Sequence, residues 1–204
     1  MRRLVISMVL VVLMCAAAVA GAQSADEWFD KGYEYGEAGN YEKAIECYTK
    51  AIELDPMYAM AYNNRGVCYK KIGQQNEAIV NYTKAIEVDP GLALAYNNRG
   101  WEYYLSGDYT RALEDVTRSL NLEPDNANTL DTRANIYREL GRYSEAMADI
   151  ERCFALLPGD PWWNYTRGVI YLDMGEIEKA RADLTRACNE GVEEGCDALG
   201  GLGN

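Results

Sequence analysis

The side chains that most often carry out chemistry in proteins are scarce in this chain of 204 residues. It contains no histidine, which excludes catalytic triads with a histidine base and histidine-ligated metal sites. It has no glycine-rich phosphate loop, no nucleophile elbow and no calcium-binding loop. Six cysteines are present, but none has the CxxC or other spacing of a zinc site. We therefore expect no enzymatic activity, no metal and no cofactor.

The charge balance is acidic. Lysine and arginine total 20 against 32 aspartates and glutamates, which gives a formal net charge of −12. A surface of this sign repels phosphate backbones, so we expect no nucleic-acid partner. Nothing in the sequence indicates a small-molecule substrate either.

The first 22 residues differ from the rest of the chain. Arg2 and Arg3 precede an apolar run over 4–20, and small residues follow at 20–22. This order predicts a secretory signal peptide over 1–22, cut after Ala22 or, as a near alternative, after Ala20. We expect an exported protein, periplasmic or secreted. An uncleaved membrane anchor over 4–20 is the alternative, because 17 apolar residues lie at the short end of the bilayer-spanning range.

A period of 34 residues organises the chain after residue 24. Within each period, tyrosine recurs at position 11, glycine at position 15, alanine at position 20 and, in four copies, proline at position 32. The columns are Tyr35, Tyr69, Tyr103, Tyr137 and Tyr171; Gly39, Gly73, Gly107, Gly141 and Gly175; Ala44, Ala78, Ala112, Ala146 and Ala180; and Pro56, Pro90, Pro124 and Pro158. Such a period predicts a repeat protein, with five contiguous units over 25–58, 59–92, 93–126, 127–160 and 161–194.

Each unit has the pattern of two helices. Apolar residues stand at helical spacing on both sides of the glycine at position 15, which supplies the left-handed conformation that ends the first helix. Proline at position 32 ends the second helix. Small residues at position 8, glycine in four units and Ala134 in the other, are expected to face the alanine at position 20 and bring the two helices close together.

A polar pattern repeats as well. Position 7 carries Lys31, Arg65, Arg99, Arg133 and Arg167, and position 23 carries Cys47, Asn81, Asp115, Asp149 and Asp183. The later units thus combine an arginine in one helix with an aspartate in the other. We predict a ladder of ion pairs and hydrogen bonds that stabilises the helix packing and has no role in binding.

These units resemble the tetratricopeptide repeat (TPR). The match is closest from Asn40 to Pro56, where the sequence NYEKAIECYTKAIELDP follows the family consensus almost throughout. The resemblance covers 25–194 and implies an all-α fold, a right-handed α-solenoid of five TPR units, with a short C-terminal cap over 195–204. It also implies that the first helix of each unit lines a concave groove that binds peptides or proteins.

The family's groove-facing positions in the first helices carry aromatic and amide side chains here. Aromatic residues are typical anchors of recognition, and an asparagine can hydrogen-bond a peptide backbone through both its donor and its acceptor. Asp131 and Thr166 occupy groove positions too. The resemblance thus implies a peptide-binding set of Phe29, Tyr33, Asn63, Asn64, Val67, Lys70, Asn97, Asn98, Trp101, Tyr104, Asn128, Asn135, Arg138, Trp162 and Tyr165.

One use of the family groove is disfavoured by the residues present. Chaperone-binding members hold a terminal carboxylate pair with lysine and arginine at fixed groove positions. Apart from an agreement at Asn64, the matching positions carry Phe29, Tyr33, Leu94 and Asn98. Because these side chains offer no positive charge, we do not expect a co-chaperone role.

Loss of Cys15 with the signal peptide leaves five cysteines. The segment around Cys188 and Cys196 is similar to cysteine-paired, Sel-like relatives of the TPR in exported bacterial proteins, which implies a disulfide between these two residues. Cys47 and Cys68 lie on helices that should be adjacent, and whether they pair is left open. Cys153 replaces a small residue and is expected to be a buried free thiol.

The sequence therefore predicts an exported scaffold that binds a peptide or protein partner in its concave groove. A structural solenoid of the cell envelope that self-associates through its outer surface is an alternative. A carbohydrate-binding envelope protein that uses the aromatic side chains for stacking is a third and weaker one. The identity of the partner and the oligomeric state stay open at this stage.

Overall fold

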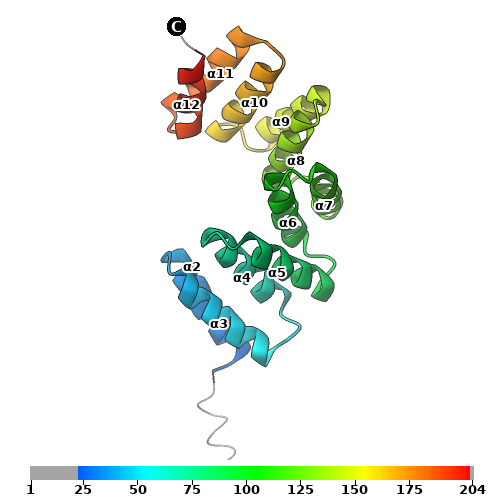
Figure 1. The fold of residues 1–204 in the computed structure, drawn as a ribbon, viewed down its shortest axis with the longest axis vertical. Coiled ribbons are helices and arrows are strands. Elements are labelled where there is room, and N and C mark those ends of the chain that lie inside the picture. Colours follow the sequence, from blue (N-terminus) through cyan, green and yellow to red (C-terminus); the bar gives the residue numbers. More distant parts are fainter. Residues whose placement is uncertain (1–22, 203–204) are drawn as a thin grey trace, which may run out of the picture.

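The computed structural model describes residues 23–202, and in this range the chain consists of helices joined by short turns (Figure 1). The predicted signal peptide over 1–22 lies outside the described residues. Five helical pairs and a final short helix follow one another along the chain: α2 (Ala25–Glu37) with α3 (Tyr41–Leu54), α4 (Ala59–Lys71) with α5 (Gln75–Val88), α6 (Ala93–Leu105) with α7 (Tyr109–Leu122), α8 (Ala127–Glu139) with α9 (Tyr143–Leu156), α10 (Pro161–Asp173) with α11 (Ile177–Asn189), and α12 (Glu193–Gly201).

The pairs stack in sequence order from α2 and α3 at one end to α12 at the other (Figure 1). The two helices of each pair pack as a hairpin, and the second helix packs on the first helix of the next pair. The first helices also contact one another, as in α4 with α6 and α6 with α8, whereas the second helices of the described chain do not. First helices therefore crowd together on the inner, concave side. The predicted all-α solenoid of repeats is confirmed.

The glycine at position 15 ends the first helix of every unit in the predicted way. All five glycines have positive φ, between +70° and +78°. In the first unit the N–H of Asn40 donates to the carbonyl of Tyr35 at 2.8 Å. The N–H of Gly39 donates to the carbonyl of Gly36 at 3.0 Å. This pair of bonds is the Schellman motif, which satisfies two carbonyls at the helix end.

Proline acts through the residue before it. Asp55, which precedes Pro56, is extended with φ −131° and ψ 94°, because a following proline disfavours helical geometry. The last unit has Val192 instead of proline, and α11 ends at another left-handed glycine, Gly191, with φ +96°.

The two helices of a hairpin approach closely at position 8, as predicted, and this approach involves position 24 as well as position 20. A Cβ atom added to Gly66 would lie 2.7 Å from the ring of Tyr82 at position 24, and 3.2 Å from the carbonyl of Ala78. The small residue thus faces the backbone of the alanine at position 20, as predicted, and also the side chain at position 24, which was not predicted. The alanine allows the approach, and the larger side chain at position 24 fills the space that glycine leaves.

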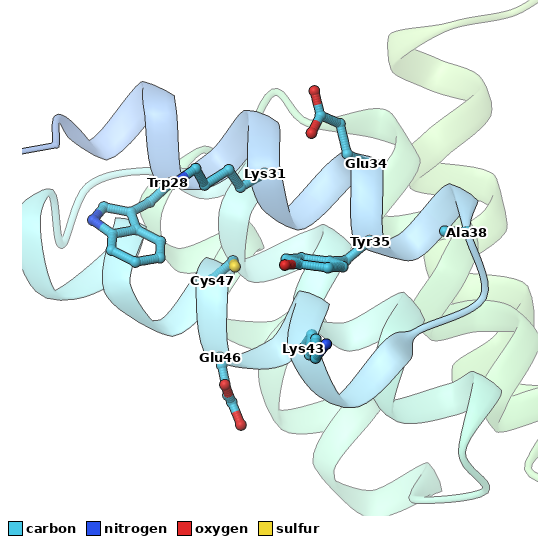
Figure 2. A pocket seen from close by; sticks show the side chains of 8 residues that line it. All are labelled: Trp28, Lys31, Glu34, Tyr35, Ala38, Lys43, Glu46 and Cys47. Carbon is cyan, nitrogen blue, oxygen red and sulfur yellow. The ribbon is translucent and has the colours of Figure 1, made fainter.

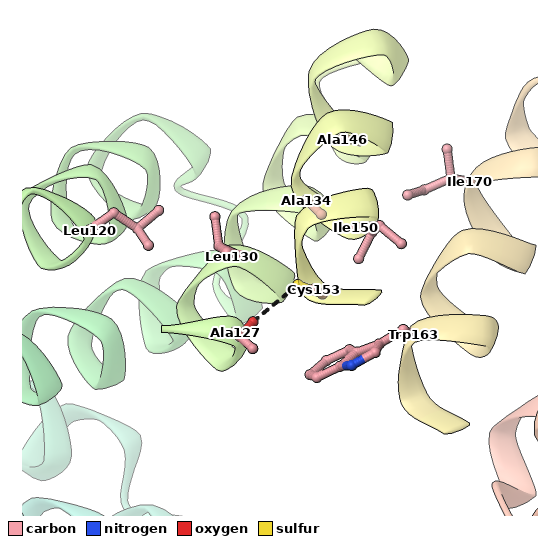
Figure 3. Packing of buried hydrophobic residues seen from close by; sticks show 9 residues of the cluster. All are labelled: Leu120, Ala127, Leu130, Ala134, Ala146, Ile150, Cys153, Trp163 and Ile170. Carbon is pink, nitrogen blue, oxygen red and sulfur yellow. Dashed lines mark hydrogen bonds between the residues drawn. The ribbon is translucent and has the colours of Figure 1, made fainter. Parts of the chain in front are cut away.

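The core of the later units is shown in Figure 3, where side chains of α7, α8, α9 and α10 meet. Ala134 and Ile150 are fully buried within it. Cys153 is a buried free thiol, as predicted, and its Sγ donates to the carbonyl of Ala127 at 3.3 Å. Burial raises the pKa of this thiol to about 12, which makes it unreactive.

The predicted polar ladder is present. Arg99 forms a bidentate pair with Asp115 at 2.7 and 2.8 Å and also donates to Thr83 of the preceding unit at 3.1 Å. The same side chain thus joins three helices from two units. Equivalent bonds connect Arg133 with Asp149, Arg167 with Asp183, and Arg65 with Asn81 and Thr49.

We predict that Asp149→Ala lowers the free energy of unfolding by about 2 kcal/mol, because it leaves the guanidinium of Arg133 unpaired among packed helices. Thermal unfolding followed by circular dichroism measures the effect. Glu151→Ala, an exposed change on the same helix, is the matched control and should leave the midpoint almost unchanged. Equal midpoints for the two variants would show that the ladder does not stabilise the fold.

The C-terminal helix α12 packs on α10 and α11. In the structure the Sγ atoms of Cys188 and Cys196 are bonded, with their Cα atoms 4.6 Å apart. The bond joins the last turn of α11 to the first turn of α12. Cys47 and Cys68 are both buried free thiols, so the two do not pair with each other.

Unreduced protein should therefore contain three free thiols among residues 23–202. Alkylation in denaturant without reductant, read by intact mass, is expected to label Cys47, Cys68 and Cys153 only. Labelling should be slow in the native state, because burial raises the pKa of Cys68 to about 11 and that of Cys153 to about 12. Five labelled thiols in this range would contradict the Cys188–Cys196 bond.

None of the described helices combines the length and the apolar character needed to cross a bilayer. The apolar run over 4–20, which carries the alternative of a membrane anchor, lies outside the described residues.

Candidate functional site

Two hollows of the described chain lie on its concave side. The α2–α4 hollow, of about 330 Å³, is lined by Tyr33, Gly36, Glu37, Tyr41, Tyr48, Asn64, Val67, Cys68 and Lys71. The α8–α10 hollow, of about 460 Å³, is lined by Trp101, Tyr104, Asn128, Asp131, Asn135, Arg138, Asp160, Trp162, Trp163, Tyr165 and Thr166. Ten of the fifteen side chains predicted to bind a peptide line one of these hollows.

Phe29 takes a different place from the one predicted. Its ring stacks on Tyr58, with centroids 4.9 Å apart, and meets Tyr48 at 5.5 Å. Phe29 therefore packs between helices and supports the groove from below. Tyr33, one turn further along α2, is 54% exposed and lines the α2–α4 hollow.

The asparagines form a connected row between α4 and α6. Asn98 donates through Nδ2 to Oδ1 of Asn63 at 3.0 Å, and Asn63 donates through Nδ2 to Oδ1 of Asn64 at 3.1 Å. Asn63 is fully buried, so its prediction as a peptide contact is wrong, since this amide instead orients its two neighbours. Asn64 and Asn98 stay partly exposed and are held in fixed positions.

Aromatic rings form the walls of the α8–α10 hollow. Trp101 and Tyr104 come from α6 with centroids 5.2 Å apart, and Trp162 and Tyr165 come from α10 in an edge-to-face arrangement at 5.8 Å. Trp162 is 45% exposed. Its neighbour Trp163, which sequence reasoning did not assign to the groove, is buried and donates through Nε1 to the carbonyl of Leu157 at 3.1 Å.

A buried acid next to this wall was missed by sequence reasoning. Glu102 is only 2% exposed, and its carboxylate lies 3.6 Å from Nζ of Lys70. The same ammonium lies 5.5 Å from the ring of Trp101. Glu102 stands at unit position 10, where units 2, 4 and 5 have Cys68, Ile136 and Ile170. Unit 1 has Glu34 at the same position, so the available signal was an acid in a column that is apolar in three of the five units.

Asp131 is the most unusual group in the α8–α10 hollow. Its Oδ1 accepts from Thr166 at 2.7 Å, and its Oδ2 accepts from Asn135 at 3.3 Å. Among the described residues no cation lies within ion-pairing distance of this carboxylate. Burial raises its pKa to about 6, and Asp160 adds to the rise, while the Thr166 hydrogen bond and Arg138 oppose it.

The only cation that lines this hollow is already engaged. Arg138 pairs with Glu139 on its own helix, and its Nε lies 3.4 Å from Oδ2 of Asp173 on α10. Asp131 and Asp160 line the hollow together with this arginine, whose charge is already balanced by Glu139 and Asp173. The hollow therefore presents aromatic surface together with excess negative charge.

The position of Asp131 predicts a stability that falls as pH rises. The unfolded chain ionises this carboxyl near its ordinary pKa of 3.8, whereas the folded protein holds the proton until about pH 6, so ionisation of this group costs stability between these values. We expect Asp131→Asn to raise the free energy of unfolding by about 1 kcal/mol at pH 7.5 and to change it little at pH 3.5. Denaturant titrations at the two pH values measure this. A destabilised Asp131→Asn at pH 7.5 would contradict it.

A third hollow, of about 580 Å³, lies at the open N-terminal end of the solenoid (Figure 2). It is lined by Trp28, Lys31, Glu34, Tyr35, Ala38, Lys43, Glu46 and Cys47. In the next unit, Arg65 at the position of Lys31 donates to Thr49 of the preceding second helix. The hollow is thus the place that a preceding helix occupies in later units. Here Nζ of Lys31 lies 5.1 Å from the ring of Trp28.

Comparison with known proteins assigns the family. Models described as tetratricopeptide repeat match 59–92, 93–126, 126–157 and 164–189, and one described as TPR repeat matches 32–73. Together these matches span most of the chain. This protein belongs to the tetratricopeptide repeat family, whose repeats support protein–protein interaction and are typically found in scaffolds without enzymatic activity.

Individual proteins match this chain over different lengths. An uncharacterized protein of Methanocaldococcus jannaschii, MJ0572, is 42% identical over 45 residues, which are 22% of this chain and 52% of that protein. YrrB, described as a TPR protein with an unusual peptide-binding site, is 21% identical with a TM-score of 0.67, covering 90% of this chain and 96% of that one. The first TPR of Spaghetti (RPAP3), bound to the HSP90 peptide SRMEEVD, is 28% identical with a TM-score of 0.56, covering 58% of this chain and 94% of that one.

Proposed function

We propose that this protein is an exported scaffold that binds an extended segment of a partner protein along its concave groove. The observation that carries this proposal is the arrangement of the two hollows and the asparagine row on the first helices. The hollows offer sites for side chains, and Asn64 and Asn98 between them offer amides that can hydrogen-bond the backbone of the partner. The peptide-binding descriptions of YrrB and RPAP3 support the same use of this fold.

The expected partner differs from the acidic peptide that RPAP3 binds. The groove positions of the family's carboxylate-binding cations hold Phe29 and Tyr33 on α2. Lys70, which does lie in the groove, is engaged by Glu102, and Arg138 is engaged by Glu139 and Asp173. An acidic terminus would therefore find no unpaired cation at these sites.

Export is part of the proposal and rests on two features. The basic and apolar N-terminal segment has the order of a signal peptide, although residues 1–22 lie outside the described structure. The Cys188–Cys196 bond is of a kind that persists in oxidising compartments such as the periplasm and the extracellular space. Retention of 4–20 as an anchor would place the same solenoid at the membrane surface.

The groove is tested by removing the two partly exposed amides together. We expect Asn64→Ala with Asn98→Ala to reduce capture of the native partner from envelope extracts by at least about tenfold, because two hydrogen-bonding groups for the ligand backbone are lost. Cross-linking pull-down read by mass spectrometry provides the measurement. Asn76→Ala with Asn121→Ala, two exposed asparagines on the second helices, is the matched control.

Unchanged capture by the groove variant, with loss of capture in the control, would overturn the groove proposal. It would favour the alternative of association through the outer surface. The observation behind that alternative is the open N-terminal end, where Trp28 and Tyr35 line a hollow that a helix covers in every later unit.

A further inference from the structure

We propose that the α8–α10 hollow binds the side chain of a basic residue, lysine or arginine, of the partner segment. The inference rests on the proposed function, since it specifies what one part of the groove recognises. It is carried by three features of the hollow: its aromatic walls, the carboxylate of Asp131 within it, and the absence of an unpaired cation among the residues that line it.

The aromatic walls suit a long cationic side chain. The aliphatic part of lysine or arginine packs on ring surfaces, and the charged end is attracted to the faces of tryptophan and tyrosine rings. Trp101 already has such a contact within the protein, with Nζ of Lys70 at 5.5 Å from its ring. Trp162, on the opposite wall, is 45% exposed and has no cation over its ring among the described residues.

The carboxylate of Asp131 supplies the counter-charge. Hydrogen bonds from Thr166 and Asn135 fix its orientation but leave it without an ion pair. Ionised Asp131 is held in a partly buried site and has no ion pair among the described residues, so its charge destabilises the free protein. A bound ammonium or guanidinium would remove this cost, and charge-assisted hydrogen bonds are among the strong polar contacts in proteins.

The surrounding charges favour the same sign of ligand. Glu139 and Asp173 balance Arg138, and Asp160 stands at the N-terminal end of α10 and lines the same hollow. An acidic side chain in this place would be repelled by Asp131 and Asp160. A neutral apolar side chain would pack on the rings but would leave the partly buried carboxylate without an ion pair.

Binding of a cation should depend on pH in a defined direction. Asp131 must be ionised to attract the ligand, so affinity should fall as pH drops through about 6. The other titratable groups around it are Asp160 and Tyr165 from α10, Arg138 from α8 and Cys153 from α9. Raised pKa values keep Tyr165 and Cys153 protonated and Arg138 charged over the range from pH 5 to pH 7.5.

The test uses capped amino acids as probes and the indole N–H signals of the four tryptophans in NMR spectra of the full-length protein. We expect Nα-acetyl-lysine methylamide and its arginine analogue to shift the signals of Trp101 and Trp162 saturably and to leave that of Trp28 in place. The uncharged norleucine analogue should bind at least about tenfold more weakly at pH 7.5. This preference should shrink at pH 5.

Asp131→Asn should abolish the preference for the charged probes while the protein stays folded. Asp30→Asn, which removes an exposed charge from α2, is the matched control and should keep the preference. Trp162→Ala provides a second variant at an exposed side chain and should weaken all charged probes. Equal binding of lysine and norleucine probes, tighter binding of a glutamate analogue, or an unchanged preference in Asp131→Asn would each overturn the inference.

Failure of this inference and failure of the proposed function have separate signatures. If charged and uncharged probes bind equally while the Asn64 and Asn98 variant loses capture, the inference about basic side chains is wrong and groove binding still stands. If the variant with both asparagines changed still captures the partner, the groove-binding proposal is wrong, regardless of how the capped amino acids bind.

Discussion

The structure depends on a close approach of two helices that is repeated in every unit. A small residue at position 8 lets a large side chain at position 24 fill the hairpin, as Gly66 does for Tyr82, where an added Cβ would lie 2.7 Å from the ring. A hairpin this thin leaves apolar surface on its outer sides, which it can bury only against a neighbouring hairpin. Stacking follows, and it places the first helices side by side on the concave face. The concave surface proposed for binding is thus a consequence of how the core is built.

The polar ladder fixes the geometry of that stacking. A bidentate arginine–aspartate pair has a defined orientation and sets how the two helices of one hairpin meet, while a bond from the same arginine to the preceding unit sets how neighbouring hairpins meet. Arg99 holds Asp115 within its own unit and reaches Thr83 of the preceding one. The bond within the hairpin recurs at Arg65, Arg133 and Arg167, and Arg65 also reaches the preceding unit, at Thr49. First helices built in this way present equivalent positions to the groove. Side chains 34 residues apart, such as Asn64 and Asn98, therefore act as one row.

Much of this could be predicted from the sequence, because repetition turns weak local signals into strong ones. Five glycines at one spacing identify a helix end more securely than one glycine does, and all five have the left-handed φ. Columns of arginine and aspartate likewise predicted the ladder. What failed were predictions for single residues. Phe29 and Asn63 occupy groove positions of the family but are used for packing and for orienting other amides.

The unpaired carboxylate of Asp131 belongs to a second group of features that the sequence did not predict. Its groove position was evident from the repeat, but its burial depends on Thr166 and Asn135, and the absence of a cation depends on how Arg138 is used elsewhere. These features depend on contacts between residues at different repeat positions, so the residue types found at any one repeat position do not reveal them. Locally unfavourable groups are common in functional sites, and this one lies in the hollow that Trp101 and Trp162 line.

The C-terminal cap connects the fold to this hollow. Within the described residues, the last hairpin is followed by one short helix instead of another hairpin, so it buries less surface on that side than an internal unit does. Here the last unit provides α10, and with it Trp162, Tyr165 and Thr166 of the hollow. Helix α12 packs on α10 and α11 and is tied to α11 by the Cys188–Cys196 bond. The bond therefore restrains the unit that forms one wall of the hollow, because it limits the ways in which the cap can separate from α10. Helix α12 therefore supports both the stability of the last unit and the position of the hollow wall that α10 provides.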